Sequence, residues 1–127
     1  MHKSMHRHKN KCYAYFPLIR TLARTERRAI MTTKPRILVT SAAGRTGAVA
    51  VLELLRMGFP VRAFVRRDDV RSEALRKAGA EIFVGDLFDL GDLRRALVDV
   101  QRAYHCPPFV PNLLHGTMLF ALAAEAI

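Results

Sequence analysis

Short apolar runs rich in β-branched residues recur along this chain, and segments with helical apolar spacing separate them. Residues 36–40 have the length and composition of a buried strand, and further strands are predicted at residues 60–65, 81–84 and 103–105. Strands and helices that alternate with short connections build a parallel sheet with helices on its faces. The sequence therefore predicts an α/β fold, a doubly wound parallel sheet of about four strands with flanking helices.

The segments between these runs predict four helices. Residues 45–57 form the first, in which Val49, Leu52 and Leu55 recur at helical spacing. The others are expected at residues 70–78, after a capping Asp89, and at residues 112–126. One apolar stripe is expected on the third helix, formed by Leu90, Leu93, Leu97 and Val100.

Residues 1–33 differ from the rest in charge. Eight Lys or Arg precede Met31 against the single Glu26, so +7 of the net charge of +10 lies there. We interpret residues 1–33 as a disordered basic extension, in which Met31 is the natural start and the residues before it lie upstream, and we expect no specific nucleic-acid partner. Two alternatives stay open, an Arg-rich targeting peptide and a metal site formed by His2, His6, His8 and Cys12.

Cysteine usage and hydropathy bear on the compartment. Cys12 and Cys106 form neither a metal-ligand spacing nor a disulfide framework, which is typical of a reducing setting. No apolar stretch reaches the roughly 18 residues of a membrane span. The sequence thus predicts a cytoplasmic protein without membrane contact.

A turn of small residues follows the first predicted strand and opens the first helix. Gly44 and Gly47 let the backbone approach an anion closely, and the helix N-terminus directs unpaired N–H groups at it. Because a βαβ unit continues behind the turn, the pattern indicates a dinucleotide-binding turn rather than a plain connection. The residues expected to contact the cofactor here are Ser41, Ala43, Gly44, Arg45, Thr46 and Gly47.

Two arginines end the second predicted strand, where NAD-binding folds carry an acidic residue. Arg66 and Arg67 are permanently charged and suit a 2′-phosphate, so they favour NADP(H) over NAD(H). The alternative is that both are solvated arginines whose partners are Asp68 and Asp69.

Asp86 and Leu87 follow the third predicted strand and therefore stand at the ligand-binding edge of the sheet. The alternative for Asp86 is that it only shapes the loop before the third helix.

These segments together resemble the NmrA-like group of atypical short-chain dehydrogenases/reductases. The resemblance lies within residues 34–126, on Ser41-Ala-Ala-Gly44-Arg-Thr-Gly47, Arg66-Arg67, Gly85-Asp86-Leu87 and Cys106-Pro-Pro-Phe-Val-Pro-Asn112. It implies a partial Rossmann-like fold with the dinucleotide turn at positions 41, 44 and 47, although the family usually has glycine at position 41. It also implies selection of the adenosine phosphate by Arg66, adenine contact from Asp86 and Leu87, and cofactor contact from Cys106 and Pro107.

The resemblance further implies that residues 34–127 are the N-terminal part of an NAD(P)-binding domain. The substrate pocket and any catalytic Tyr and Lys would then lie beyond Ile127, and Tyr104 and His105 are interpreted as strand residues without a nearby partner. Two functions agree with this: an oxidoreductase that transfers hydride from NADPH to a small electrophile such as a quinone, and a non-catalytic NADP sensor that regulates a partner. A truncated reading frame without function is a third.

The end of the chain carries more apolar surface than one buried helix face holds. The apolar residues of the last predicted helix include Leu113, Leu114, Met118, Leu119, Phe120 and Leu122. In the usual strand order, 3-2-1-4 and onward, the fourth strand would also be an exposed edge here. We therefore expect the chain alone to be marginally stable and to self-associate.

Overall fold

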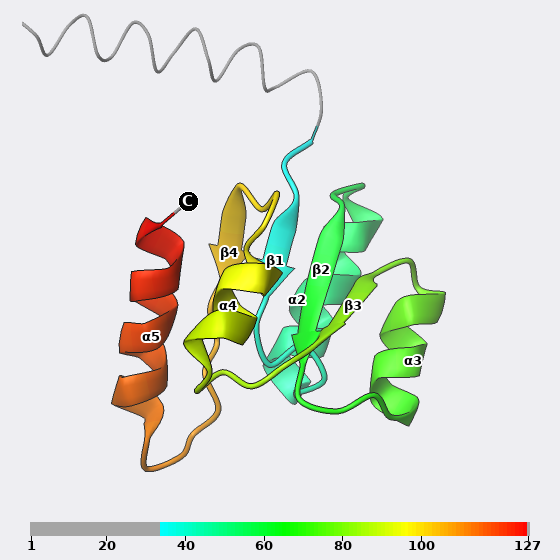
Figure 1. The fold of residues 1–127 in the computed structure, drawn as a ribbon. Coiled ribbons are helices and arrows are strands. Elements are labelled where there is room, and N and C mark those ends of the chain that lie inside the picture. The colour runs from blue at the N-terminus through cyan, green and yellow to red at the C-terminus, as the bar shows by residue number, and fades with distance from the viewer. Residues whose placement is uncertain (1–33, 127) are drawn as a thin grey trace, which may run out of the picture. The chain divides into compact units, whose positions relative to one another are not determined.

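The computed structural model describes residues 34–126, which form a parallel sheet with helices on both sides (Figure 1). The strands are β1 (Ile37–Val39), β2 (Val61–Val65), β3 (Glu81–Val84) and β4 (Arg102–Tyr104). They lie in the order β3-β2-β1-β4, and every pairing is parallel. The predicted fold, a partial Rossmann-like doubly wound sheet, is confirmed.

The helices are α2 (Arg45–Arg56), α3 (Val70–Lys77), α4 (Leu90–Ala96) and α5 (Leu113–Glu125). Asp69 and Asp89 accept hydrogen bonds from backbone N–H groups in the first turns of α3 and α4. Each such cap contributes about 1 kcal/mol to stability and fixes where its helix begins. Gly58 and Gly79 follow the ends of α2 and α3 with positive φ angles of 80° and 108°, a conformation that glycine adopts without strain.

The sheet separates two apolar cores. Successive residues of β1 point to opposite faces, so Ile37 and Val39 join one core and Leu38 joins the other. The first core lies against α2 and α3, and the second lies against α4 and α5. Because both faces are covered, β1 and β2 are buried along their whole length, and in β2 this includes Arg62. The buried strand predicted at residues 36–40 is confirmed at β1.

The helix that the spacing of Val49, Leu52 and Leu55 predicts is confirmed, but only one of these three residues packs against the core. Val49 and Leu52 are 67% and 48% exposed, whereas Leu55 packs against the core. The buried residues of α2 are instead Gly47 and Val51. The reason is close packing: α2 approaches the turn after β1 so tightly that small side chains must face it.

The third helix and the fourth strand differ from prediction by short shifts. α4 ends at Ala96, and Leu97 is its C-cap, yet Leu93 and Leu97 are buried as expected. Leu90 and Val100 pack against the same core, so the predicted stripe is confirmed although it extends past the helix. β4 begins and ends one residue earlier than expected, which places His105 after the strand.

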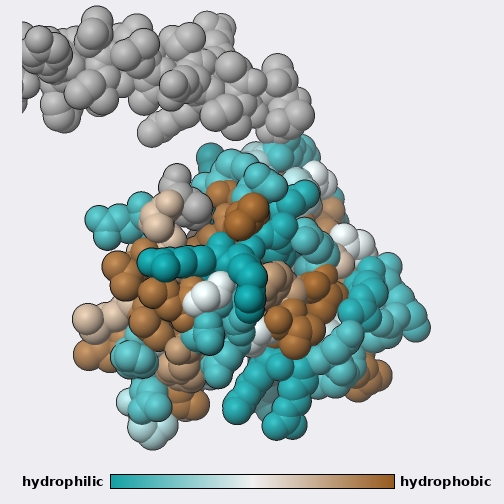
Figure 2. Space-filling view, viewed as in Figure 1, coloured by the Kyte–Doolittle hydropathy of each residue, from teal (hydrophilic) through white to brown (hydrophobic). Residues whose placement is uncertain are grey.

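The surplus of apolar surface on the last helix is confirmed. Leu114, Met118 and Leu122 of α5 are 72%, 64% and 49% exposed, whereas Phe120 and Ala123 are buried. Figure 2 shows hydrophobic residues gathered over α5. β4 forms an edge of the sheet in the described part of the chain, and its residues are exposed.

No helix among residues 34–126 combines the length and the apolar composition needed to cross a membrane. The basic extension at residues 1–33, the alternative targeting peptide and the alternative site at His2, His6, His8 and Cys12 all lie outside the described residues.

A buried arginine joins β2 to the end of α4. Nη1 of Arg62 donates to the carbonyl oxygens of Ala96 and Val98, both at 2.7 Å, and Nη2 lies 3.0 Å from Glu81. Replacing Arg62 with Met is expected to lower the free energy of unfolding by about 2 kcal/mol, because two carbonyl groups lose their donor. Denaturant unfolding measures this loss.

Arg36→Met is the matched control for Arg62→Met. Arg36 lies 3.8 Å from the same Glu81 carboxylate, but its side chain is 37% exposed. Its loss should cost less than about 1 kcal/mol. An equal loss of unfolding free energy in the two variants would show that the ion pair with Glu81, and not the contacts with the carbonyl groups, stabilises the fold.

Candidate functional site

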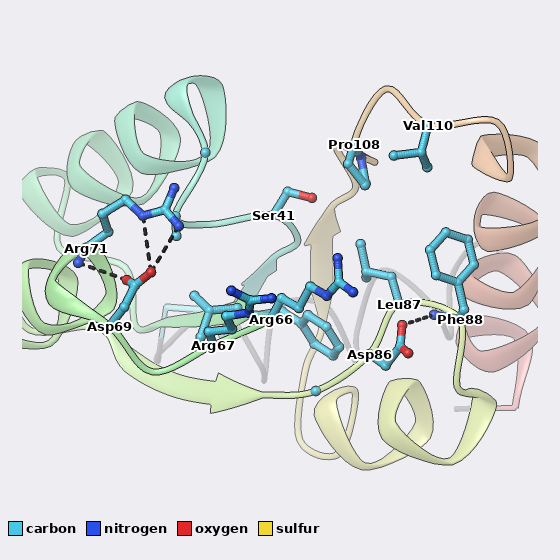
Figure 3. A pocket seen from close by; sticks show the side chains of 15 residues that line it. Ser41, Arg66, Arg67, Asp69, Arg71, Asp86, Leu87, Phe88, Pro108 and Val110 are labelled. Atoms are coloured by element: carbon cyan, nitrogen blue, oxygen red, sulfur yellow. Dashed lines mark hydrogen bonds and ion pairs between the residues drawn. The ribbon is translucent and has the colours of Figure 1, made fainter.

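The carboxyl ends of the parallel strands meet at one edge of the sheet, where the turns that follow them enclose a pocket of about 500 Å³ (Figure 3). The turns after β1, β2 and β3 and the loop after β4 all contribute to its lining. In open α/β sheets this edge is where ligands bind. The pocket therefore stands where the sequence predicts a site.

The pocket brings together residues that lie far apart in the sequence. The predicted site residues that line it are Ser41, Ala43, Gly44, Arg66, Arg67, Asp86 and Leu87. Other predicted site residues are not part of the lining, and these are Arg45, Thr46, Gly47, Cys106 and Pro107. Gly47 is buried beneath the turn, and Arg45 and Thr46 are exposed at the start of α2. Cys106 and Pro107 precede Pro108, through which their loop reaches the pocket.

The turn after β1 is held against its neighbours by backbone contacts. Ala42 donates its N–H to the carbonyl oxygen of Phe64 at 3.1 Å, and Gly44 donates to that of Ser41 at 2.9 Å. A Cβ at Gly47 would lie only 2.2 Å from the Ser41 oxygen, so glycine is required there. Ser41 has a left-handed φ of 50°, a conformation that glycine adopts without strain.

The N-terminus of α2 is open to a ligand. Its N-cap, Gly44, offers no side-chain hydrogen bond to the first turn, whereas α3 and α4 are capped by aspartates. Unpaired N–H groups and the positive end of the helix dipole are left at this end. Together with the small residues of the turn, they form a suitable cradle for a phosphate.

Arg66 and Arg67 project into the pocket, and neither makes a hydrogen bond or ion pair within residues 34–126 (Figure 3). The acids proposed as their alternative partners are engaged elsewhere. Asp68 lies 2.9 Å from Arg76 and accepts a hydrogen bond from Ser72, and Asp69 caps α3. The alternative is therefore wrong in its partners, Asp68 and Asp69, although both arginines are exposed as it expects.

Local hydrogen bonds also keep these two carboxylates ionised. The Ser72 hydroxyl and then the Arg76 guanidinium lower the pKa of Asp68. The Arg71 guanidinium, helped by the Ser72 backbone N–H, lowers the pKa of Asp69. The partners of both acids are thus groups of α3, and Arg66 and Arg67 are not among them.

Asp86 both shapes its loop and lines the pocket. Its Oδ1 accepts the Phe88 N–H at 2.9 Å, and its own N–H donates to Asp92 Oδ2 at 2.9 Å. The bond from the Asp86 backbone lowers the pKa of Asp92. Asp86 therefore shapes its loop, as the alternative expects, but it also lines the pocket as an exposed residue together with half-buried Leu87.

Sequence reasoning missed several lining residues, namely Asp69, Arg71, Phe88, Pro108 and Val110. A signal existed for Arg71, because it lies in the first turn of the helix that starts at this edge of the sheet. Phe88 could have been found from its place two residues after Asp86. For Pro108 and Val110 the signal was the Pro-rich loop itself, although the sequence assigned the contact to Cys106 and Pro107.

Beside the pocket, a buried threonine joins β1 to the loop after β4. Thr40 Oγ1 accepts the Cys106 N–H at 2.9 Å and hydrogen-bonds His105 Nδ1 at 3.1 Å. The His105 ring stacks on Phe120 of α5, with ring centroids 4.2 Å apart. The expectation that His105 has no nearby partner is therefore wrong, because the fold brings a residue 65 positions away into contact.

Burial lowers the pKa of His105, and its Nε2 is buried with no hydrogen-bond partner among the described residues. The folded protein then binds fewer protons at His105 than the unfolded chain, in which histidine titrates at about pH 6.5. The neutral ring's contribution to stability is present above that pH and is lost as pH falls toward the lowered pKa. We expect the thermal midpoint to decrease on acidification through this window.

The variant His105→Phe tests whether His105 causes this pH dependence of the thermal midpoint. Phenylalanine keeps an aromatic ring against Phe120 but does not titrate. Thermal melts at a series of pH values should show a shallower decrease for His105→Phe than for the wild type. His115→Phe, at an exposed position of α5, is the control and should keep the wild-type slope. Identical slopes for His105→Phe and the wild type would assign the effect to other groups.

Within residues 34–126, no three His, Cys, Asp or Glu side chains are placed to hold a metal ion. The side chains that surround the pocket are instead cationic, acidic and apolar groups.

The model of the NmrA-like family matches residues 33–126. Sterol demethylase protein B of Methylococcus capsulatus is 47% identical over 74 residues, which are 58% of this chain and 22% of that protein. Among solved structures, NADPH-dependent quinone oxidoreductase from Escherichia coli, in complex with NADPH, has a TM-score of 0.62 and 26% identity. That match covers 71% of this chain and 32% of the oxidoreductase.

Triphenylmethane reductase from Citrobacter sp., in complex with NADP(H), matches with a TM-score of 0.61 and 26% identity over 71% of this chain and 33% of the reductase. A mutant NmrA has a TM-score of 0.67 at 22% identity, which bears on the fold alone. The chain thus spans 22% to 33% of the length of these three named relatives, the sterol demethylase protein and the two reductases. With a family model that covers all the described residues and a fold shared with these reductases, the chain belongs to the NmrA-like family of NAD(P)-binding, oxidoreductase-type proteins.

Proposed function

We propose that residues 34–126 bind NADP(H) at the carboxyl edge of the sheet, as the cofactor-binding part of an oxidoreductase. The observation that carries the proposal is the pair Arg66 and Arg67, which line the pocket while the neighbouring acids are engaged elsewhere. Two guanidinium groups without acidic partners leave positive charge available to a 2′-phosphate, which NAD(H) lacks. NADP(H) is therefore proposed to bind more tightly than NAD(H).

The remaining site residues are assigned by where they lie. Ser41, Ala43 and Gly44 line the pocket, and we assign them close approach to the pyrophosphate. Arg45 and Thr46 begin α2, and we assign their backbone N–H groups to contact with the same anion. Gly47 has no Cβ and therefore lets the turn pack closely against the helix.

We assign the remaining cofactor contacts to residues that follow β3 and β4. Asp86 and Leu87 are assigned to the adenosine moiety, since they line the pocket after β3. Cys106 and Pro107 are assigned as cofactor contacts through the loop that reaches the pocket at Pro108. The E. coli and Citrobacter relatives, which are described as complexes with NADPH and NADP(H), support the binding of a nicotinamide dinucleotide.

The reaction we propose is reduction of a small electrophile such as a quinone, for which bound NADPH supplies the hydride. Likeness to a quinone oxidoreductase supports this substrate class. Since the chain spans about a third of that enzyme, we place the substrate site and the catalytic residues outside residues 34–126. No observation within the described residues favours the alternative of a non-catalytic NADP sensor.

We also propose a cytoplasmic location and self-association through the exposed apolar residues of α5. Leu114, Met118 and Leu122 would lose their contact with water in such an assembly, and burial of apolar surface is favourable. Sedimentation velocity over a range of concentrations tests the assembly. A monodisperse monomer with a cooperative thermal transition would contradict it.

Calorimetric titration of the purified chain with NADPH and then with NADH, in moderate salt, tests the proposed function. We expect saturable binding that is tighter for NADPH. Equal or tighter binding of NADH would contradict the assigned preference, and no binding of either would contradict the cofactor site. NADPH oxidation measured with a panel of quinones then tests the proposed reaction in a chain that binds the cofactor.

A further inference from the structure

Two hydrogen bonds to Thr40 hold the start of the loop after β4, which comprises residues 105–112. Thr40 directly follows β1, and its Oγ1 lies 2.9 Å from the Cys106 N atom and 3.1 Å from His105 Nδ1. Further along the same loop, Pro108 and Val110 line the pocket (Figure 3). The position of this part of the pocket wall therefore depends on the contacts of Thr40.

This arrangement requires His105 Nδ1 to act as an acceptor. The Thr40 hydroxyl has one hydrogen to donate, and its oxygen already accepts the Cys106 N–H. Thr40 makes no other side-chain hydrogen bond within residues 34–126, so its hydroxyl hydrogen is donated to Nδ1. Nδ1 can accept only in the neutral ring, because both nitrogens of a protonated histidine are donors. The neutral ring then carries its proton on Nε2.

Protonation makes this place unfavourable for the His105 ring. Nδ1 would direct its new hydrogen at Thr40, and the hydroxyl hydrogen of Thr40, a fully buried residue, would lose its acceptor. Nε2 is buried without a hydrogen-bond partner among the described residues, so its N–H would have no acceptor for the charge that it carries. The hydrogen-bond geometry thus favours the neutral ring.

Among the described residues, no acidic side chain pairs with His105. The ring hydrogen-bonds Thr40 and stacks on Phe120 of α5, and the Cys106 thiol is the titratable group beside it in the loop. Burial lowers the pKa of His105, and no neighbouring charge contributes to the shift. The positive charge of a protonated ring is therefore not offset in this place.

We propose that protonation of His105 releases the loop after β4 from Thr40, so that the pocket holds its ligand with full affinity only while the ring is neutral. Because His105 directly precedes Cys106, movement of the charged ring into water withdraws the Cys106 N–H from Thr40. Pro108 and Val110 are then no longer held at the pocket. The part of this inference that concerns the ligand rests on the proposed function, whereas the release of the loop does not.

Burial of the ring gives the pH dependence its sign. In the released loop His105 titrates at about pH 6.5, and in the held loop its pKa is lower. The held loop is therefore fully favoured above about pH 6.5, and it loses stability relative to the released loop as the pH falls toward the lowered pKa. Between about pH 7.5 and pH 5.5 this one group can change the equilibrium by about tenfold at most.

Amide hydrogen exchange of the unliganded chain at about pH 7.5 and pH 5.5 tests the release of the loop. The protection factor of the Cys106 N–H, which corrects for exchange in an unfolded chain, should fall about threefold to tenfold in the wild type and stay constant in His105→Phe. Thr40→Val removes the hydroxyl but keeps the branched side chain, and it should give low protection at both pH values. The Ala42 N–H, which donates to Phe64 instead, is the internal control for unfolding of the whole domain.

Calorimetric titration with NADP⁺ at the same two pH values tests the effect on the pocket. Because the 2′-phosphate itself titrates near pH 6, the loss of affinity in the wild type is compared with the loss in His105→Phe. We expect the wild-type loss to be about threefold larger. His115→Phe, which keeps a ring beside Phe88, should behave as the wild type.

Cys106 protection that is equal at both pH values would overturn the inference, as would an equal fall in His105→Phe or at Ala42. Equal losses of NADP⁺ affinity in the wild type and His105→Phe would overturn the link between the loop and the pocket. A wild type that binds no dinucleotide at about pH 7.5 would instead overturn the proposed function. The exchange measurement would still decide in that case whether His105 holds the loop.

Discussion

Replacing Gly47 with alanine is expected to lower the free energy of unfolding by about 3 kcal/mol and to abolish measurable NADPH binding. The added Cβ would lie 2.2 Å from the Ser41 oxygen and 2.9 Å from the Ala42 Cα. These are backbone atoms, and Ala42 is fully buried and bonded to the Phe64 carbonyl. The turn therefore cannot move without loss of its contact with β2, and overpacking of this kind costs 1–3 kcal/mol or more.

Denaturant unfolding and calorimetric titration measure the two effects of Gly47→Ala. The control is Val49→Ala, on the same helix at a position that is 67% exposed, which should change neither quantity by much. Wild-type NADPH affinity in Gly47→Ala would contradict the assignment of the turn as the cradle of the pyrophosphate.

The double variant Arg66→Gln/Arg67→Gln is expected to bind NADPH about 100-fold more weakly than the wild type and NADH with nearly unchanged affinity. The physical reason is that the two guanidinium groups have no acidic partner in the described residues, so their charge is available to the ligand. Two charge-assisted contacts to phosphate are together worth about 3 kcal/mol, the equivalent of roughly 100-fold.

Arg94→Gln/Arg95→Gln is the control for this double variant. Arg94 and Arg95 are also adjacent, lie in the last turn of α4 and do not line the pocket. Both double variants remove two positive charges, although Arg95→Gln also removes the ion pair with Asp92. If both variants weakened NADPH and NADH alike, a general effect of net charge would replace the specific contact as the explanation.

The fold is predictable from this sequence because its signals are local. β-branched runs mark buried strands, and an aspartate before a helix marks the cap that satisfies its first N–H groups, as at Asp69 and Asp89. The buried face of α2, in contrast, does not follow from a local signal. Val49 and Leu52 have helical spacing, but the close approach at Gly47 decides which face meets the sheet, and that distance is a property of the assembled unit.

The site was predictable in part for a related reason. The residues that follow each strand meet at one edge, so positions such as Arg66 and Asp86 follow from strand order. The hydrogen-bond and ion-pair partners of these side chains do not follow from strand order. Asp69 stands beside Asp68 and close to the two arginines in sequence, yet the geometry of the helix start directs it to Arg71. The contact between Thr40 and His105 likewise depends on β1 and β4 being neighbours in the sheet.

The hydrogen bond from Cys106 to Thr40 holds the start of the loop after β4 against β1, whereas the tip of the loop is exposed. At the start, the Cys106 N–H is bound to a hydroxyl that is itself fully buried. At the tip, Phe109 is completely exposed. Amide hydrogen exchange should therefore be slow at Cys106 and fast three residues later, and a protease should cut first near Phe109. Pro108 and Val110 line the pocket on either side of that tip. A ligand bound in the pocket should therefore slow proteolytic cleavage of the loop.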